Sequence, residues 1–411
     1  MPLDPFFADR LRTHRAYLIR TTLQGYAERW GWPWLARLAV RLAPPPPPAH
    51  AAATSAASTK PKPAAAAEGS GLGTAVTEGS PPARDAAHAR TGSSPAAKPT
   101  KTRRKPSRAA HRKAAVAWDR KELAAVGRPG PDVRIEEHVI PVPGRRDVRV
   151  RIYRPELADA EPVPDAPPVP ATLAFYGGGF RIGGIDYPTT DAGFRLRAFD
   201  AGIAVVAVDY SLAPEHKFPT AVEQGYAALE WLGSEAERLG IDRDRLAISG
   251  ISAGGNIAAA VTLLNRDRAG VPLRLQLLEV PVVDLTGRHI DLGPVRAMGV
   301  PTFLAVRELR SVSRTYLPSP SDARDPLASP LLASSHAGLP PAHILTAEYD
   351  ALRGEGAAYG AALRAAGVEA TVVRYLGMTH DTPVFLGAVA AARRWHRDVV
   401  SAFRTLHDDA S

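Results

Sequence analysis

Cysteine is absent from the 411-residue chain, which excludes disulfide bonds, a thiol nucleophile and any metal site built on cysteine ligands. No run of about 20 consecutive apolar residues occurs either, so a membrane-spanning helix is not expected. The chain also lacks a secretion signal: Asp4 and Asp9 lie where basic residues belong, and arginines interrupt the apolar stretch. We therefore expect a cytoplasmic protein.

Acidic residues are scarce in the first quarter of the chain. Residues 1–113 hold 19 Lys and Arg against 6 Asp and Glu, a net charge of +13, whereas the whole chain carries only +9. The remaining residues are therefore slightly acidic. Since that larger part offers no excess of basic residues to attract a polyanion, no nucleic-acid partner is predicted.

Large apolar side chains are missing from residues 44–110, which contain 12 Pro and 19 Ala but no Phe, Trp, Tyr, Ile or Met. Such a segment cannot bury a core, so we predict a disordered Pro/Ala/Lys-rich linker. It leads into a basic run of Arg103, Arg104, Lys105, Arg108, Arg112 and Lys113. We interpret this run as a solubilising tail in preference to a tether for membrane or nucleic acid.

Residues 1–43, ahead of the linker, have apolar side chains at helical spacing and three tryptophans near their end. Tryptophan and arginine on amphipathic helices are typical of an interfacial membrane anchor. The interpretation we favour is that these helices pack on their own protein, so membrane contact by this segment is not the expected outcome.

From residue 132 onward, short β-rich runs alternate with helical stretches near 218–239, 253–266, 354–366 and 383–406. This alternation predicts an α/β fold in which helices cover both faces of a mostly parallel sheet. The first two strands form a predicted hairpin, and some 60 residues between the sixth and seventh strands, helical near 301–316, are long enough to form a lid. The eight expected strands are 132–140, 147–154, 171–176, 203–209, 245–250, 274–281, 343–348 and 370–376.

The fifth strand runs into Gly250-Ile251-Ser252-Ala253-Gly254, a GxSxG string followed by an alanine-rich helix. The string alone is weak evidence, but the order strand, turn, helix is the arrangement that exposes a nucleophilic serine above a sheet. Glycines flank such a serine because the turn brings neighbouring backbone too close for side chains. Ser252 is therefore the predicted nucleophile.

A serine nucleophile needs a base, and the base needs a group that orients it. His380 follows the eighth strand, at the same edge of a parallel sheet as Ser252, and is the predicted base. The remaining loop alternatives are His216, His289 and His336.

Two carboxylates compete for the orienting role. Asp350 ends the seventh strand and Asp284 ends the sixth, and the order Ser, Asp, His fits either of them. We favour Asp350, because a loop beside the last strand is best placed to reach His380. Asp381 is expected to be a solvated loop carboxylate.

Three successive glycines follow the third strand in Tyr176-Gly177-Gly178-Gly179-Phe180. Their backbone N–H groups can converge on a developing oxyanion, and the amide of Ala253 adds a third donor. A phosphate cradle is the alternative, but the string lacks the Lys-Ser/Thr of a P-loop.

Together these motifs resemble the hormone-sensitive lipase family of α/β-hydrolase esterases, and the resemblance covers about 111–411. The strings that carry it are YGGGF, VDYSLAPEHKFPTAVEQGYAALEWL, GISAGGN, DPLASPLL, TAEYDALRGEG and GMTHD. The resemblance implies an α/β-hydrolase fold in which Ser252 is the nucleophile, Asp350 the acid and His380 the base. It further implies that Gly178, Gly179 and Ala253 donate to the oxyanion.

The family resemblance also implies a cap over the site, built from residues 1–43 and the insertion at about 286–316. Phe7, Leu11, Leu18, Trp30 and Trp34 would then pack on this insertion. The chain departs from the family pattern in three places: Tyr176 replaces the histidine of HGGG, Ile251 replaces an acidic residue, and Gly354 replaces the second aspartate of DPLRDEG.

The predicted function is hydrolysis of small to medium carboxylic esters by an acyl-enzyme mechanism that needs no cofactor or metal. A non-catalytic small-molecule receptor on the same fold is one alternative, although the plant gibberellin receptors, which resemble this family, have lost the base that His380 supplies here. An amidase or peptidase with the same triad is another. The oligomeric state is left open.

Overall fold

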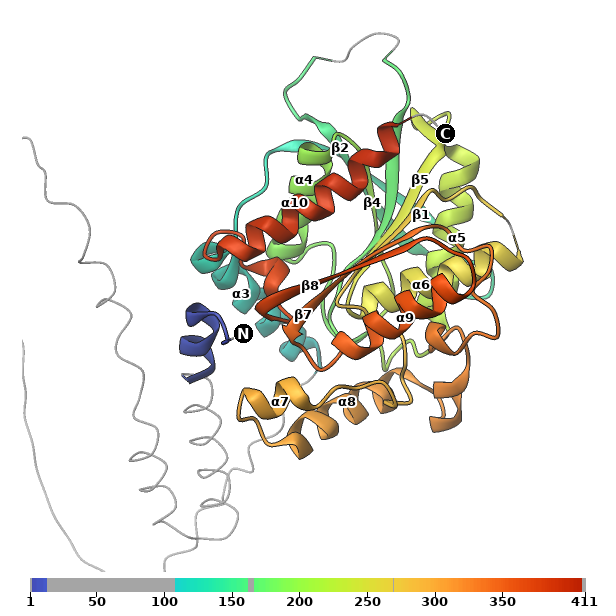
Figure 1. Cartoon of the computed structure of the whole chain (residues 1–411). Helices are drawn as coiled ribbons and strands as arrows, with labels where there is room; N and C mark the ends of the chain where they lie inside the picture. Colours follow the sequence, from blue (N-terminus) through green and yellow to red (C-terminus); the bar gives the residue numbers. More distant parts are fainter. Residues whose placement is uncertain (1, 13–107, 162–165, 269, 409–411) are drawn as a thin grey trace, which may run out of the picture. The chain divides into compact units, whose positions relative to one another are not determined.

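The computed structural model describes residues 2–12, 108–161, 166–268 and 270–408 (Figure 1). These residues belong to one compact unit, and the predicted linker, except for residues 108–110, lies outside them. An eight-stranded sheet in the order β1-β2-β4-β3-β5-β6-β7-β8 forms its centre, as predicted. The strands are β1 Val133–Ile140, β2 Val148–Leu157, β3 Val169–Phe175, β4 Ala204–Asp209, β5 Ile241–Ile251, β6 Leu275–Glu279, β7 Ala342–Tyr349 and β8 Ala370–Thr379.

The direction of the strands decides where the loops that carry function meet. β1 pairs antiparallel with β2 in the predicted hairpin, and β2 pairs antiparallel with β4. All other pairings, from β4–β3 across to β7–β8, are parallel. The carboxyl ends of β3 to β8 therefore share one edge of the sheet, where ligands bind in open α/β sheets.

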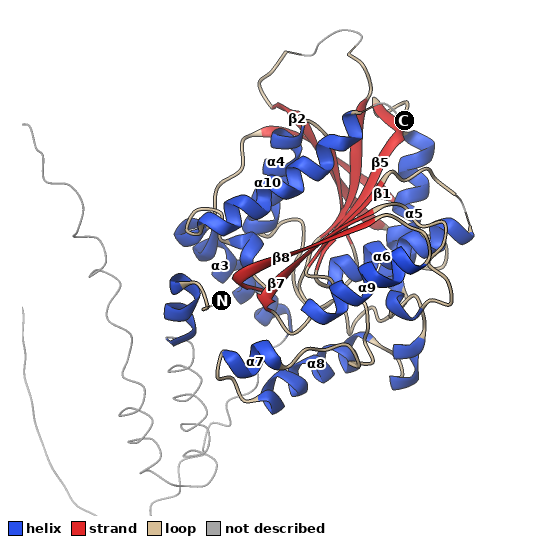
Figure 2. Ribbon diagram, in the orientation of Figure 1, coloured by secondary structure: helices blue, strands red, loops and turns tan. Residues whose placement is uncertain are grey.

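Helices cover both faces of the sheet (Figure 2). One face carries α3 Arg108–Val126, α4 Pro188–Ala201 and α10 Ala390–Arg404, and the other carries α5 Thr220–Glu235, α6 Ala253–Asp267 and α9 Arg353–Ala365. Between these layers the strands bury apolar runs, and side chains such as Leu173, Val206 and Ile248 are completely buried. Burying each such side chain contributes about 1.5–3 kcal/mol.

The helices differ from the sequence-based expectation at three points. α4 was not predicted, because its apolar residues are interspersed with arginines and its periodicity is weak. α10 begins at Ala390 instead of 383, since Pro383 and Gly387 interrupt the preceding segment. α3 begins at Arg108 and so reaches into the range 44–110 that was predicted to be linker.

The long interval between β6 and β7 is an insertion at the carboxyl edge of the sheet, as predicted. It contains α7 Gly293–Ala297 and α8 Thr302–Tyr316, followed by the short 3-10 helices η1 Pro320–Arg324 and η2 Pro330–Leu332. Both α helices lie apart from the two layers that cover the sheet (Figure 1). α8 buries Tyr316 at its end and leaves Phe303 two-thirds exposed near its start.

Of the predicted N-terminal helices, residues 5–12 are described and helical. Phe7 is buried, but its ring contacts are with Phe6 and Phe385, not with the insertion at 286–316 as expected. Leu18, Trp30 and Trp34 lie outside the described residues. None of the helices that the structure describes is both long and apolar enough to cross a membrane.

Candidate active site

Ser252 occupies the sharp turn between β5 and α6. Its backbone angles are φ 56° and ψ −115°, and its N–H donates to the carbonyl of Glu279 at 2.8 Å. A Cβ on Gly250 would lie 2.2 Å from the oxygen of Gly254, and a Cβ on Gly254 would lie 2.3 Å from the oxygen of Phe175. Only glycine fits at either position, which explains the GxSxG string and leaves the serine side chain free to point out of the turn.

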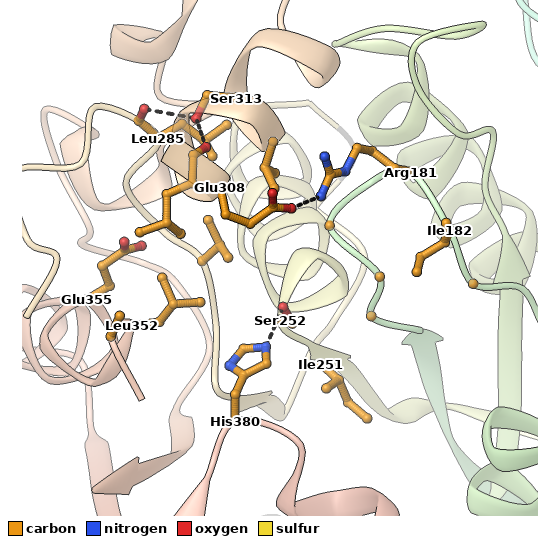
Figure 3. Close-up of a pocket in the computed structure, with 18 of the residues that line it drawn as sticks. Arg181, Ile182, Ile251, Ser252, Leu285, Glu308, Ser313, Leu352, Glu355 and His380 are labelled. Carbon is orange, nitrogen blue, oxygen red and sulfur yellow. Dashed lines mark hydrogen bonds and ion pairs between the residues drawn. The ribbon is translucent and has the colours of Figure 1, made fainter. Parts of the chain in front are cut away.

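The structure brings Ser252, His380 and Asp350 together, although they come from three different strand ends. The Nε2 of His380 lies 2.9 Å from the Oγ of Ser252 (Figure 3). Its Nδ1 lies 2.8 Å from the Oδ2 of Asp350. Asp350 is nearly fully buried, and its other oxygen accepts the N–H of Leu352. The imidazole is thus held between a hydroxyl and a carboxylate, the geometry that base-assisted serine attack requires.

The charge of Asp350 governs the protonation of His380. Burial lowers the pKa of this histidine, but the negative charge of Asp350, its hydrogen bond and the charge of Asp381 together raise the pKa to about 9. The exposed Asp381 contributes only through its charge, consistent with the solvated position expected for it.

The competing carboxylate, Asp284, is bonded to a different histidine. Its Oδ2 lies 2.8 Å from the Nδ1 of His289, and its Oδ1 accepts both the N–H and the hydroxyl of Thr286. Although burial opposes the effect, the bonds from Thr286 and His289 lower the pKa of Asp284. This second pair fixes the start of the insertion. Gly354 is needed there, because a Cβ on it would lie 2.5 Å from the carbonyl oxygen of His289.

The other two loop histidines have no place in this arrangement. His336 bonds through Nε2 to the carbonyl of Pro330, and neither His336 nor His216 lines the cavity that holds Ser252.

The glycine loop, residues 177–184, carries the predicted oxyanion donors. Gly178 and Gly179 have φ angles of 132° and 58°, and the carbonyl of Gly178 accepts the N–H groups of Arg181 and Ile182 at 3.1 Å each. A Cβ on Gly178 would lie 2.0 Å from the oxygen of Ile182. Within the described ranges, the amides of Gly178, Gly179 and Ala253 donate no hydrogen bond.

Tyr176, at the position where the family has histidine, directly precedes this loop and is held by hydrogen bonds to Tyr210. Its hydroxyl donates to the carbonyl of Tyr210, and the hydroxyl of Tyr210 donates back to the carbonyl of Tyr176, at 3.1 and 2.8 Å. The two buried rings are stacked with centroids 4.3 Å apart. These two bonds hold the backbone at Tyr176, where the glycine loop begins.

Two residues near the site were not predicted to be part of it. Glu355 is buried in the wall of the cavity and accepts the N–H groups of Val283 and Asp284 at 2.7 and 2.9 Å. Burial raises its pKa to about 8. Arg112, predicted as part of a solvated basic run, instead donates to the carbonyl of Arg181 in the glycine loop and pairs with Glu215.

Ser252 and His380 open into a cavity of about 1550 Å³. Its walls come from the glycine loop, the insertion with α8, and residues of α3 and α4 such as Trp118 and Phe194. The volume exceeds the about 300–1,000 Å³ of common small-molecule pockets. In the part of the chain that the structure describes, no three or more His, Asp or Glu side chains are grouped to hold a metal ion.

Known proteins that are similar to this chain in sequence or structure include carboxylic ester hydrolases. Residues 172–384 match a family model described as the alpha/beta hydrolase fold. Carboxylesterase NlhH of Mycobacterium tuberculosis is 36% identical over 67% of this chain and 84% of its own length. The carboxylic ester hydrolase LipN of the same organism is 41% identical over 61% of this chain and 65% of its own.

The solved structure of EstE1, a thermostable carboxylesterase cloned from a metagenomic library, is similar over 74% of this chain and 99% of its own, with a TM-score of 0.66 and 38% identity. Fold, sequence relatives and solved structures therefore agree with the resemblance seen in the motifs. The chain belongs to the hormone-sensitive lipase family of α/β-hydrolase serine esterases.

Proposed function

We propose that Ser252, His380 and Asp350 carry out ester hydrolysis in this enzyme through an acyl-enzyme. The Oγ of Ser252 attacks the ester carbonyl while the Nε2 of His380 takes its proton and then returns it to the departing alcohol. A water molecule, activated by the same imidazole, releases the acid and restores the serine. The observation that carries the proposal is the continuous chain of bonds from Ser252 through His380 to Asp350.

The amides of Gly178, Gly179 and Ala253 are proposed to bind the oxyanion that forms in each tetrahedral intermediate. Their support is that Gly178 and Gly179 line the same cavity as Ser252, that Ala253 follows Ser252 in the chain, and that none of the three amides donates a hydrogen bond within the described ranges. Losing one such donor typically costs about 3 kcal/mol of transition-state stabilisation.

The insertion at 286–316 is proposed to act as a cap that selects substrates. Residues of α8, among them Leu309 and Val312, line the cavity opposite the serine. Small to medium acyl chains are the proposed substrates of this cavity, and the ester series below measures how far its capacity extends.

The test is hydrolysis of p-nitrophenyl esters of increasing acyl length by the wild type, Ser252→Ala and His380→Ala. Because nucleophile and base act as a unit, we expect each variant to lose at least about a thousandfold in kcat. The exposed Ser234→Ala on α5 is the matched control and should keep full activity. Retention of more than about a tenth of wild-type kcat by either variant would assign the chemistry to other residues. Binding of esters without turnover by the wild type would favour the receptor alternative.

A further inference from the structure

The glycine loop adopts a backbone that is costly for one of its residues. Gly178 and Gly179 have positive φ angles, as glycine readily does, but Phe180 also has φ 61°. A bulky residue in this left-handed region persists only when its surroundings hold it there. The contacts of Phe180 and its neighbours therefore decide whether the loop keeps its shape.

The first of these contacts comes from the end of α8. The ring of Phe180 stacks on that of Tyr316, with centroids 3.7 Å apart and planes inclined by 8°. Both rings are buried, and Phe218 packs against Tyr316 edge-on. The carbonyl of Tyr316 also accepts the N–H of Phe218 at 3.0 Å, so this end of the insertion is itself fixed to the main domain.

A second contact comes from the middle of α8. The guanidinium of Arg181 pairs with Glu308 at 2.5 Å (Figure 3). It also donates to the hydroxyl of Ser311 at 3.2 Å. The backbone N–H of the same arginine donates to the carbonyl of Gly178. Arg181 thus joins the helix directly to the turn that presents the oxyanion donors, while Arg112 of α3 holds its carbonyl from the other side.

We propose that α8, besides covering the cavity, positions the oxyanion donors, and that Tyr316 and Arg181 are the positioning residues. The inference rests on the proposed function, since it concerns the same oxyanion hole. Tyr316 holds Phe180 in its left-handed conformation, and Arg181 holds the turn at Gly178. A displacement of about 1 Å at such a site can cost about 100-fold in rate, so a contact that never touches substrate can still control turnover.

Positioning and covering predict different kinetics. A helix that only walls the cavity affects KM and the preference for acyl length, because its side chains touch the substrate in ground state and transition state alike. A helix that positions the donors affects kcat, because the oxyanion is absent from the bound ester and develops only as Ser252 attacks its carbonyl carbon.

The test compares Tyr316→Leu and Arg181→Gln with the wild type. Two readouts are used: kcat and KM for p-nitrophenyl butyrate, and the inhibition constants of an alkyl trifluoromethyl ketone and its unfluorinated methyl ketone. The Oγ of Ser252 adds to the carbonyl carbon of the fluorinated ketone while the serine proton passes to His380. The product is a tetrahedral adduct with an oxyanion, and it is stable because the ketone has no leaving group. The affinity of the fluorinated ketone therefore reports on the donors, whereas the methyl ketone reports on ground-state binding.

We expect each variant to lower kcat and the affinity for the fluorinated ketone by about the same factor, on the order of 10-fold. This loss is smaller than the about 10²–10³ that follows removal of a whole donor. KM and the methyl ketone should change little. Tyr316→Phe, which keeps the ring, should restore most of the loss. Arg307→Gln is the matched control, because it removes the same charge from an exposed position on the same helix.

The proposal is overturned if Tyr316→Leu and Arg181→Gln both leave kcat and the fluorinated-ketone affinity within about twofold of wild type. A change confined to KM for long acyl chains would also overturn it and leave α8 as a wall. If Tyr316→Leu does not fold, Arg181→Gln, at a half-buried position, decides alone. Failure of the proposed function would appear separately, as full activity in Ser252→Ala.

Discussion

Two aspartates lie at the carboxyl edge of the sheet, and each is bonded to its own histidine. Asp350 contacts His380, and Asp284 contacts His289. Only the first of these imidazoles reaches Ser252. A protonated imidazole cannot accept the serine proton. The protonation state of His380 therefore controls the reaction directly.

The raised pKa of His380 sets the expected pH dependence. Because the pKa of His380 is about 9 in the free enzyme, the fraction of neutral imidazole increases as pH rises toward 9. We therefore expect kcat/KM to increase through the alkaline range and not to level off near pH 6.5. In Asp350→Asn the midpoint should move to lower pH, because the charge that raises the pKa is gone while burial still lowers it. Its activity should also fall by about 10⁴ as the imidazole loses its orienting acceptor.

Asp284→Asn is the matched control, measured as a pH profile of kcat/KM over the same range. It should leave the midpoint unchanged, because Asp284 is bonded to His289. A shifted midpoint in Asp284→Asn together with an unshifted one in Asp350→Asn would assign the acid to the loop after β6.

At the scale of elements, Glu355 joins the first turn of α9 to the loop that follows β6. Its Oε2 accepts two buried N–H groups, from Val283 and Asp284. Burial, with contributions from the charges of Asp284 and Asp350, raises its pKa to about 8 in spite of these bonds. The side chain therefore carries a proton at neutral pH in the folded protein.

This raised pKa has a consequence for stability. Between the unfolded value of 4.5 and about 8, the folded state binds more protons than the unfolded state, so Glu355 makes the protein less stable as pH rises through that range. Glu355→Gln removes the titration and keeps an oxygen acceptor for the two amides. We expect its unfolding temperature, relative to wild type, to increase between pH 5 and pH 8.5.

The exposed Glu237→Gln serves as the control for that thermal series and should show no such trend. A difference between Glu355→Gln and wild type that stays constant with pH would mean that Glu355 is ionised in the folded protein throughout the range.

At the scale of the whole molecule, the N-terminal helix packs against the segment that follows the predicted base. The helix at residues 5–12 packs Phe7 onto Phe385, which lies between His380 and α10. Arg10 pairs with Glu122 of α3 at 2.7 Å and lies over the ring of Phe385. The N-terminal segment therefore supports the same stretch of chain that carries the base.

Phe7→Ala should lower the free energy of unfolding by about 3 kcal/mol, because it removes a buried ring and leaves Phe385 partly uncovered. Thermal unfolding and the temperature at which esterase activity is lost should fall together. Arg12→Ala, a change at an exposed position in the same helix, should have an effect within about 0.5 kcal/mol. Equal unfolding temperatures for both variants would show that residues 5–12 contribute no stability to the enzyme.

Most of the architecture was readable in the sequence by itself, because local patterns cause it. Apolar runs alternating with amphipathic stretches determined the eight strands and most of the helices, and strand direction then placed Ser252, His380 and the glycine loop at one edge. The GxSxG turn was equally local, since a Cβ at Gly250 would lie only 2.2 Å from the oxygen of Gly254 and glycine is therefore required. α4 was missed because its burial comes from packing on β2, not from a clear periodicity.

Only the tertiary structure decided which residues pair across long distances in the chain. Asp350 and Asp284 fit the same sequence order, and packing alone assigned one to each histidine. Arg112 looks like every other residue of its basic run until α3 brings it to the carbonyl of Arg181. The contact between Arg181 and Glu308 joins residues 127 positions apart. Charge and hydropathy specify what a side chain can bind, but its actual neighbour depends on how the elements pack, which no local pattern records.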